Sequence, residues 1–562
     1  MAFIVGKKQD GRTYYYLAES ARVGGKPRIV SQRYLGSAEE IAARLSETGP
    51  GEPDRTRHLA FGDLAAVWGM LERLRVAEIV DEAVGGRRGD ALASVGTYIA
   101  LAVANRLVDP CSKLAFSKWW AKTAGDRWVR LPAAAFDHRR FWDAMDAISD
   151  NQLKDIERRI VTRMVEVFAV DLSGLVLDMT NFATYIDSAN DRAPIAQRGH
   201  AKQKRTDLRL VGLGLVVSTD GGIPLVSHAY PGNRPDVTQF PEMVNELVTR
   251  FGAIAEGAGE LTLVYDAGQD SHSNQQLIED SPLHFVGSLP PSDHPDLLAV
   301  AKRRYKVVDK QRFPGLTAFE TTKVVFGHER RLVVTHSQNL HTKQARGFDQ
   351  TLAKARRQLG ELATRLARGK TRKPREKVEA EITAILKPRW LSRIMSTSLS
   401  GESPTELRLT WRTNQKARTD LEAELFGKRI LFTDRDEWTI AMVVGGYRSQ
   451  SEVEADFRQM KDPDIVSFSP MFHWTNQKIQ VHSFYCVIAL TIARLMRREA
   501  QRAGISMSVT ELLDTLDGIE ETVLLYQGER GRPRARRMLT EMTPTQQRLY
   551  DLFDLDTYAP KR

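Results

Sequence analysis

Five residues towards the carboxyl-terminal end of the chain could act together in phosphoryl transfer. Tyr447, Gln450, Glu454, Arg458 and Lys461 are separated by three, four, four and three positions. Because successive residues of a helix are rotated by about 100°, these side chains fall within an arc of roughly 80°. The glutamate could hold a metal ion while the cations contact DNA phosphates. A solvated helix with an ion pair between Glu454 and Arg458 is the simpler explanation of this stretch taken alone.

Two aspartates follow short apolar segments that are typical of buried strands. Asp178 ends the segment 174–178, and Asp266 follows the segment 261–265. Neighbouring strands of such a sheet bring their ends to one edge, so we expect the two carboxylates to converge there. With Glu454 they would supply oxygen ligands for two Mg²⁺ ions about 3.5–4 Å apart. A turn-forming role is the alternative for either aspartate considered alone.

The segments around these aspartates predict an α/β core. Strand patterns at 174–178, 210–218 and 223–228 precede a helix at 236–251, a strand at 261–265, another helix and a strand at 284–288. Three strands, a helix, a strand, a helix and a strand form the order of a ribonuclease-H-like core. A helix at 447–461 and a core helix at 478–500 would complete it.

We therefore predict a multidomain α/β protein with six regions. They are an N-terminal β-hairpin region (1–50), a helical DNA-binding region (51–170), the first part of the ribonuclease-H-like core (171–290), an inserted α+β subdomain (291–435), the second part of the core (436–505) and a C-terminal basic region (506–562). The insertion contains a charged segment, 342–387, that favours an antiparallel helical hairpin with a basic tip at 369–374.

The composition suits a protein that binds nucleic acid. Lys and Arg together exceed Asp and Glu by ten, which favours a polyanionic partner. Two cysteines in 562 residues exclude a disulfide scaffold and a cysteine-rich zinc site. The first residues do not resemble a signal peptide, and the apolar stretch 481–496 is shorter than a membrane span. We expect a cytoplasmic, nucleoid-associated bacterial protein.

The motifs in combination resemble those of bacterial insertion-sequence DDE transposases. One group of these enzymes carries Tyr-x2-Arg-x3-Glu-x6-Lys on its late helix, and Tyr447, Glu454 and Lys461 match that spacing. Gln450 stands where the group has arginine, so Arg448 or Arg458 would have to supply that charge. Segments 15–26, 199–205, 231–233 and 470–482 also resemble one subgroup, so the similarity runs from about residue 12 to about residue 500.

This resemblance implies a metal-dependent DNA transposase. Asp178, Asp266 and Glu454 would be the catalytic residues and the ligands of Mg²⁺, for which Mn²⁺ can substitute. The residues implied or expected to contact DNA are Tyr447, Arg448, Arg458, Lys461, Lys202, Lys204 and Arg205. The enzyme would bind double-stranded DNA, both its terminal inverted repeats and its target, as a homodimer in a synaptic complex. Some members hold a flipped base with an aromatic residue of the insertion, for which Trp390, Trp411 and Trp438 are candidates.

Other functions remain open at this point. A ribonuclease-H-like nuclease or resolvase would share the core but would cut DNA without joining strands. A catalytically inactive derivative would bind DNA only. A recombinase with a tyrosine or serine nucleophile would form a covalent protein–DNA adduct, although no motif of that kind stands out.

Overall fold

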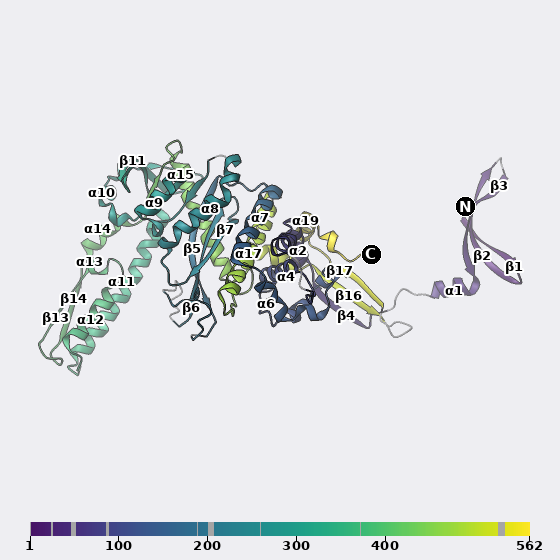
Figure 1. Ribbon diagram of the computed structural model, residues 1–562, viewed down its shortest axis with the longest axis horizontal. Helices are drawn as coiled ribbons and strands as arrows, with labels where there is room; N and C mark the ends of the chain where they lie inside the picture. Colours follow the sequence, from purple (N-terminus) through teal and green to yellow (C-terminus); the bar gives the residue numbers. More distant parts are fainter. Residues whose placement is uncertain are drawn as a thin grey trace. The chain divides into compact units, whose positions relative to one another are not determined.

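The computed structural model describes residues 2–23, 26–46, 52–85, 89–187, 189–199, 207–258, 260–370, 372–526 and 534–561, and Figure 1 shows their helices and strands. The chain divides into two compact units. Unit 1 comprises Met1–Ala66, Trp120–Val129 and Asp514–Arg562, and unit 2 comprises Val67–Trp119 and Arg130–Leu513.

Unit 2 is built on a mixed sheet whose nine described strands follow the order β10-β11-β12-β15-β9-β8-β5-β6-β7. Their bounds are β5 (Gly174–Thr184), β6 (Arg209–Ser218), β7 (Pro224–Pro231), β8 (Thr262–Val264), β9 (His284–Leu289), β10 (Lys306–Val307), β11 (Leu316–Val325), β12 (His328–Ser337) and β15 (Lys428–Thr433). Strand β8 is parallel to both of its neighbours, β5 and β9. The other neighbouring pairs are antiparallel.

The strands expected around the two aspartates are present as β5 to β9, but the sheet is larger than expected. Residues 306–337 and 428–433, which we assigned to an inserted subdomain, extend the same sheet by four strands. The antiparallel pairing of β15 with β9 makes this extension possible. It also buries Leu332, Val333 and Val334 of β12, apolar residues that a separate subdomain would have to cover by other means.

Between β12 and β15 the chain forms an arm. Its elements are α11 (Gln338–Ala367), α12 (Arg375–Leu386), α13 (Leu391–Ile394), β13 (Met395–Ser400), β14 (Arg408–Thr413) and α14 (Gln415–Leu425) (Figure 1). Helices α11 and α12 pack as the expected helical hairpin, and the buried side of α11 carries Phe348, Leu352 and Leu359 at helical spacing. At the base of the arm Gly427 has φ +80°, and a Cβ there would approach the Ser337 carbonyl to 2.9 Å.

Helix α17 (Asn476–Arg502) forms the centre of the helical layer of unit 2. It packs against α4 (Val95–Val108), α6 (His138–Asp146), α7 (Asp150–Phe168) and β7. Among the described helices it alone has the length and hydropathy of a membrane span, and 94% of that apolar window is buried inside the protein. Burial by neighbouring helices therefore explains its composition, as expected for a core helix.

The remaining helices of unit 2 include α3 (Val76–Val84), α8 (Asp236–Ala258), α9 (His272–Glu279), α10 (Pro295–Leu298), α15 (Ile440–Arg448) and α16 (Gln450–Met460). Helices α2 (Gly62–Arg73), α5 (Phe116–Trp120) and α18 (Val509–Asp517) each extend over a boundary between the two units. Residues 51–170, which we expected to be helical, thus form mainly helices from α2 onwards to α7.

Unit 1 contains two small antiparallel sheets. The expected hairpin is formed by β2 (Arg12–Val23) and β3 (Lys26–Ser37), with β1 (Ala2–Gln9) added beside β2 and α1 (Ala38–Ser46) after β3. The second sheet has the order β17-β16-β4, from β4 (Arg55–Ala60), β16 (Glu520–Tyr526) and β17 (Arg534–Leu539), and α19 (Pro544–Leu552) follows. The region predicted to be helical therefore begins with a strand, because β4 pairs with residues more than 400 positions later.

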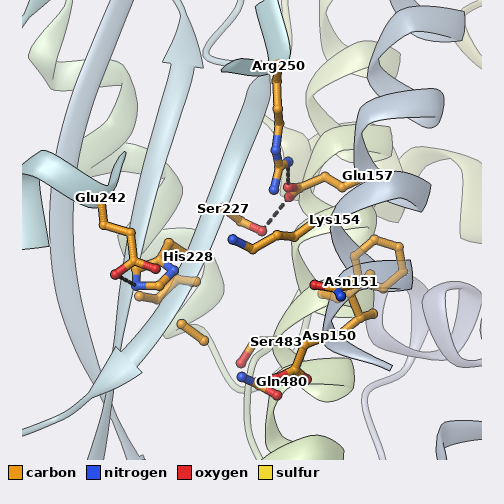
Figure 2. A pocket seen from close by; sticks show the side chains of 14 residues that line it. Asp150, Asn151, Lys154, Glu157, Ser227, His228, Glu242, Arg250, Gln480 and Ser483 are labelled. Atoms are coloured by element: carbon orange, nitrogen blue, oxygen red, sulfur yellow. Dashed lines mark hydrogen bonds and ion pairs between the residues drawn. The ribbon is translucent and has the colours of Figure 1, made fainter. Parts of the chain in front are cut away.

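A buried ion network connects α7, β7 and α8 in unit 2. Figure 2 shows Arg250 pointing at Glu157, which also accepts a hydrogen bond from the Ser227 hydroxyl. Arg250 bonds Glu246 as well, and Lys154 lies 2.9 Å from the same carboxylate. All of these residues except Glu246 line a cavity of about 300 Å³. Since each charge has an opposite charge beside it, the network is explained by packing between the three elements.

Removing Arg250 should destabilise unit 2 strongly, because Glu157 would remain buried without a counter-charge. For Arg250→Met we expect a loss of about 3–5 kcal/mol in the free energy of unfolding, measured by urea denaturation. The matched control is Arg357→Met, whose ion pair with Glu361 is 70% exposed on both sides and should contribute less than about 1 kcal/mol. Equal losses in the two variants would contradict this role.

Candidate active site

The register of two parallel strands places the two aspartates side by side. Strands β5 and β8 pair through Leu175 with Leu263 and Val176 with Val264. Asp178 and Asp266 each lie two residues beyond the last of these pairs. Because parallel neighbours advance together along the sheet, Asp178 lies level with Asp266. Asp266 follows the end of β8, whereas β5 continues to Thr184, so the expectation that Asp178 ends its strand is wrong. The convergence of Asp178 with Asp266 that the strand pattern predicts is therefore consistent with the observed pairing.

A hydrogen-bonded triangle holds the Asp266 carboxylate. The hydroxyl of Tyr447 and that of Ser288 both donate to Asp266 Oδ1 at 2.9 Å, and the two hydroxyl oxygens are 3.1 Å apart. Burial, together with the charge of Asp266, raises the pKa of Tyr447 to about 12. The phenol therefore keeps its proton at neutral pH and acts as a donor. Sequence reasoning did not identify Ser288, because a serine inside a buried strand carries no distinctive pattern.

Tyr447 and Glu454 lie on two consecutive helices instead of the single helix that we expected. Helix α15 ends at Arg448 and α16 begins at Gln450, with Ser449 between them. The Ser449 hydroxyl donates to the Gly446 carbonyl and so competes with the backbone hydrogen bonds of a continuous helix. The two helices still share a cavity, which Tyr447, Gln450 and Glu454 line together.

That cavity is predominantly cationic. It has a volume of about 400 Å³, and Lys343, Arg429 and Arg448 line it with the exposed carboxylate of Glu454. The amide nitrogen of Gln450 is buried there and has no hydrogen-bond partner in the described part of the chain. The arrangement can accept a ligand that is rich in anionic oxygen atoms.

Lys461, the residue that follows α16, contacts the strand that carries Asp178. Its ammonium donates to the Thr180 hydroxyl at 2.7 Å and lies 5.4 Å from the centre of the Phe182 ring. Thr180 is two residues from Asp178, so the two side chains share one face of β5. Arg458 is exposed and forms no salt bridge with Glu454 among the described residues, so the simple ion-paired helix is not what the structure contains.

The carboxylates suit Mg²⁺ in their chemistry, because they offer only acceptor oxygen atoms. Among the described residues, however, no group of three or more His, Cys, Asp or Glu side chains is arranged to hold a metal ion. Asp178 and Asp266 are the two candidate ligands that the strand register brings together, whereas Glu454 faces the neighbouring cavity. The residues thus match a magnesium site in the chemistry of their oxygen atoms.

Several expected residues lie elsewhere. Trp390 packs against Phe426 in the arm, Trp411 lies on β14 and Trp438 lies beside Arg435, and none of the three lines the cavity that contains Glu454. Lys202, Lys204 and Arg205 fall outside the described residues.

Asp270 is a fourth acidic residue near this edge that the sequence pattern did not indicate. Both of its carboxylate oxygen atoms are buried without a hydrogen-bond partner in the described chain. Burial, with a further contribution from the charge of Asp266, raises the pKa of Asp270 to about 8 from an ordinary value of 3.8. Asp270 is therefore protonated in the folded protein at neutral pH.

This buried acid should make stability depend on pH. Between about pH 4 and pH 8 the folded state retains a proton that the unfolded chain loses, so rising pH destabilises the fold, by at most about 1.4 kcal/mol per pH unit. Asp270→Asn lacks this proton, so its stability relative to wild type should increase from pH 5 to pH 8. Urea denaturation in EDTA at both pH values measures the difference. A difference that does not change with pH would contradict the assignment.

Comparisons with known proteins find a distant structural likeness to a transposase. No family model and no curated protein sequence matches this chain. Among solved structures the chain is similar to the piggyBac transposase in a cryo-EM structure of its synaptic complex with hairpin DNA. The TM-score is 0.38 at 9% sequence identity, and the alignment covers 83% of this chain and 82% of that chain.

Proposed function

We propose that the protein is a DDE transposase that binds the terminal inverted repeats of its insertion sequence and catalyses DNA cleavage and strand transfer. One observation carries the proposal: the parallel register of β5 and β8 sets Asp178 level with Asp266, and Tyr447 from a helix distant in sequence is hydrogen-bonded to Asp266. The strand order β7-β6-β5-β8-β9, in which only β6 runs antiparallel to the other four strands, supports a ribonuclease-H-like core. Two of these strands carry or precede the aspartates of the motif, because Asp178 lies on β5 and Asp266 follows β8.

The charges around this edge suit a DNA backbone. Lys461 lies over β5, and Lys343, Arg429 and Arg448 line the cavity beside Glu454. Cations at these positions can bind successive phosphates and so orient a duplex over the aspartates. The unpaired amide of Gln450 can donate to a phosphate oxygen, although it carries no charge. Gln450 can thus donate a hydrogen bond where the resemblance implies an arginine, but it cannot supply the positive charge of that arginine.

The proposed reaction is two successive phosphoryl transfers. Water attacks a phosphorus atom at the element end, the bond from phosphorus to the 3′ oxygen breaks, and a free 3′-OH results. That 3′-OH then attacks a target phosphodiester, and one phosphodiester forms as another breaks, so no energy source is required. Bound Mg²⁺, or Mn²⁺, would neutralise the charge that develops on the transferring group.

The chain's own residues have distinct tasks in this scheme. Tyr447 and Ser288 fix Oδ1 of Asp266 through their hydroxyls, which leaves the second oxygen of that carboxylate for a ligand. Lys461 positions the strand that carries Asp178. Because both transposon ends must be held at once, we propose a homodimer in the complex with paired ends.

Glu454→Gln should abolish cleavage and strand transfer while leaving binding to the end DNA intact. We expect a loss of about 100-fold or more in rate, since losing only a partner of a metal ligand can already cost about 10–100-fold. The assay uses Mg²⁺ and DNA ends from the inverted repeats that flank the gene. The control is Glu452→Gln on the same helix, whose carboxylate lies 3.8 Å from Arg497 instead of in the cavity.

The products of this assay separate the possible functions. Cleavage and joining by wild type, lost in Glu454→Gln and kept in Glu452→Gln, supports the transposase. Cleavage without joining would indicate a nuclease or resolvase, and binding without cleavage would indicate an inactive derivative. Equal cleavage by wild type and Glu454→Gln would show that the third carboxylate is a different residue.

Tyr447→Phe should slow cleavage by about 10–100-fold without weakening DNA binding, because it removes only the hydroxyl that holds Asp266. Tyr305→Phe is the matched control. The Tyr305 hydroxyl is also buried but has no hydrogen-bond partner in the described chain, so its removal should leave the rate unchanged. Single-turnover cleavage rates test both variants. A wild-type rate for Tyr447→Phe would exclude a role for its bond to Asp266.

A further inference from the structure

A separate cavity of unit 2 combines buried cations with exposed aromatic rings. Its volume is about 430 Å³, and its walls come from α4 and residues 111–114, from α6, from residues 470–474 and from α17. The three carboxylates proposed for catalysis do not line it. It is large enough for a ligand of the size of one nucleotide.

Lys113 contributes a buried ammonium group without an anion. The side chain is 7% exposed, and its nitrogen has no hydrogen-bond partner in the described part of the protein. The ammonium instead lies 4.7 Å from the centre of the Tyr485 ring and 5.2 Å from that of Phe141. Burial, assisted by repulsion from Arg106, lowers the pKa of Lys113 to about 7. An anionic ligand would relieve this unfavourable burial.

Arg106 is the second cation of the cavity, and it is only 1% exposed. Its guanidinium donates to the carbonyls of Ser469 and Cys111 and to the side chain of Asn105, and its Nε has no partner. All of these acceptors are neutral. Among the described residues that line the cavity there is no Asp or Glu. The charge of Arg106, and that of Lys113 when it is protonated, is thus not balanced within the cavity.

Two histidines beside these cations are neutral. Burial, together with the nearby charges of Lys113 and Arg106, lowers the pKa of His473 to about 3. Burial also lowers the pKa of His482, whose Nδ1 accepts from the Tyr485 hydroxyl while Nε2–H donates to the Phe468 carbonyl at 2.7 Å. Both rings therefore contribute shape and polarity without adding to the charge.

Aromatic side chains surround the opening. Phe472 is 56%, Trp474 51% and Trp142 38% exposed, although these are large apolar groups. Arg192 lies 4.7 Å from the Trp474 ring centre, and the His138 ring meets Trp142 edge-on. These contacts restrain the two indoles while leaving ring surface accessible. Exposed rings at the mouth of a cavity suit a flat aromatic ligand.

We propose that this cavity binds one unpaired nucleotide of a DNA strand, with its base stacked on the rim aromatics and its phosphate near Lys113 and Arg106. The aromatic rim of the cavity suits the base of this ligand, and the two cations suit its phosphate. A free phosphate would leave the rings uncovered, and an uncharged aromatic ligand would leave the cations unbalanced. The choice of DNA as the source of the nucleotide rests on the proposed function.

The test uses isothermal titration calorimetry of the full chain in EDTA. The ligands are a thymidine dinucleotide, which has one charged phosphodiester, and its uncharged methylphosphonate analogue. We expect the charged ligand to bind about tenfold more tightly to wild type. Lys113→Met should lose that tenfold preference and bind the two ligands equally. Trp474→Ala should weaken the binding of both by about tenfold, since stacking is lost.

Two controls separate binding from folding. Lys118→Met removes an exposed lysine of α5 and should leave both affinities unchanged. Lys113→Met should have an unfolding temperature equal to or above that of wild type, because it removes an unpaired buried cation. A large fall in that temperature would indicate a structural lysine and would overturn the assignment.

Other outcomes also decide the question. Unchanged affinity of the charged dinucleotide for Lys113→Met and Trp474→Ala would overturn the proposal. So would inorganic phosphate that binds as tightly as the dinucleotide and is insensitive to Trp474→Ala, since this would indicate a simple anion site. DNA cleavage without dinucleotide binding would refute only the proposal that this cavity binds a nucleotide. Dinucleotide binding without DNA cleavage would refute only the proposal that the protein is a transposase.

Discussion

The parallel pairing of β5 with β8 is the constraint on which the candidate site depends. Their backbone groups are buried and must be paired with each other, so the register between them is held firmly. A slip of one residue would turn Asp178 to the opposite face of the sheet, away from Lys461 and α16. The triangle of Asp266, Ser288 and Tyr447 then depends on β9, which the parallel pairing with β8 places next in the sheet.

Local sequence pattern was sufficient for the elements that carry the chemistry. Apolar runs before the two aspartates predicted the positions of β5 and β8, and periodicity predicted the helical character around Glu454. The end of β5 was predicted wrongly, because this strand continues past Asp178 to Thr184. Pairing over long distances was not predictable, because periodicity identifies a strand without identifying its neighbour. Two strand pairings that could not be predicted in this way are that of β4 with β16 and that of β15 with β9. The break at Ser449 and the burial of Asp270 likewise depend on tertiary contacts that no local spacing encodes.

Two of the polar cavities of unit 2, the one beside Glu157 and the one beside Lys113, differ in how their charges are balanced. Around Glu157 and Arg250 each charge has an opposite neighbour, and the cavity is explained by the packing of α7, β7 and α8. Around Lys113 and Arg106 the described lining has cations and neutral side chains but no Asp or Glu. Charge balance thus distinguishes a cavity that is explained by packing from one that can take an anionic ligand. Volume alone does not, since the two cavities measure about 300 and about 430 Å³.

The arm also determines the order in which the sheet can be assembled. Strands β12 and β15 are separated by about 90 residues, and closing so long a loop has a high entropic cost. The contacts within α11, α12, β13 and β14 are short in sequence and can form first. Once folded, the arm holds its two ends together, as the bond from the Ser337 amide to the Gly427 carbonyl at 2.8 Å shows. The folded arm therefore brings β15 beside β12, so that β15 joins a sheet whose first strand, β5, begins some 250 residues earlier.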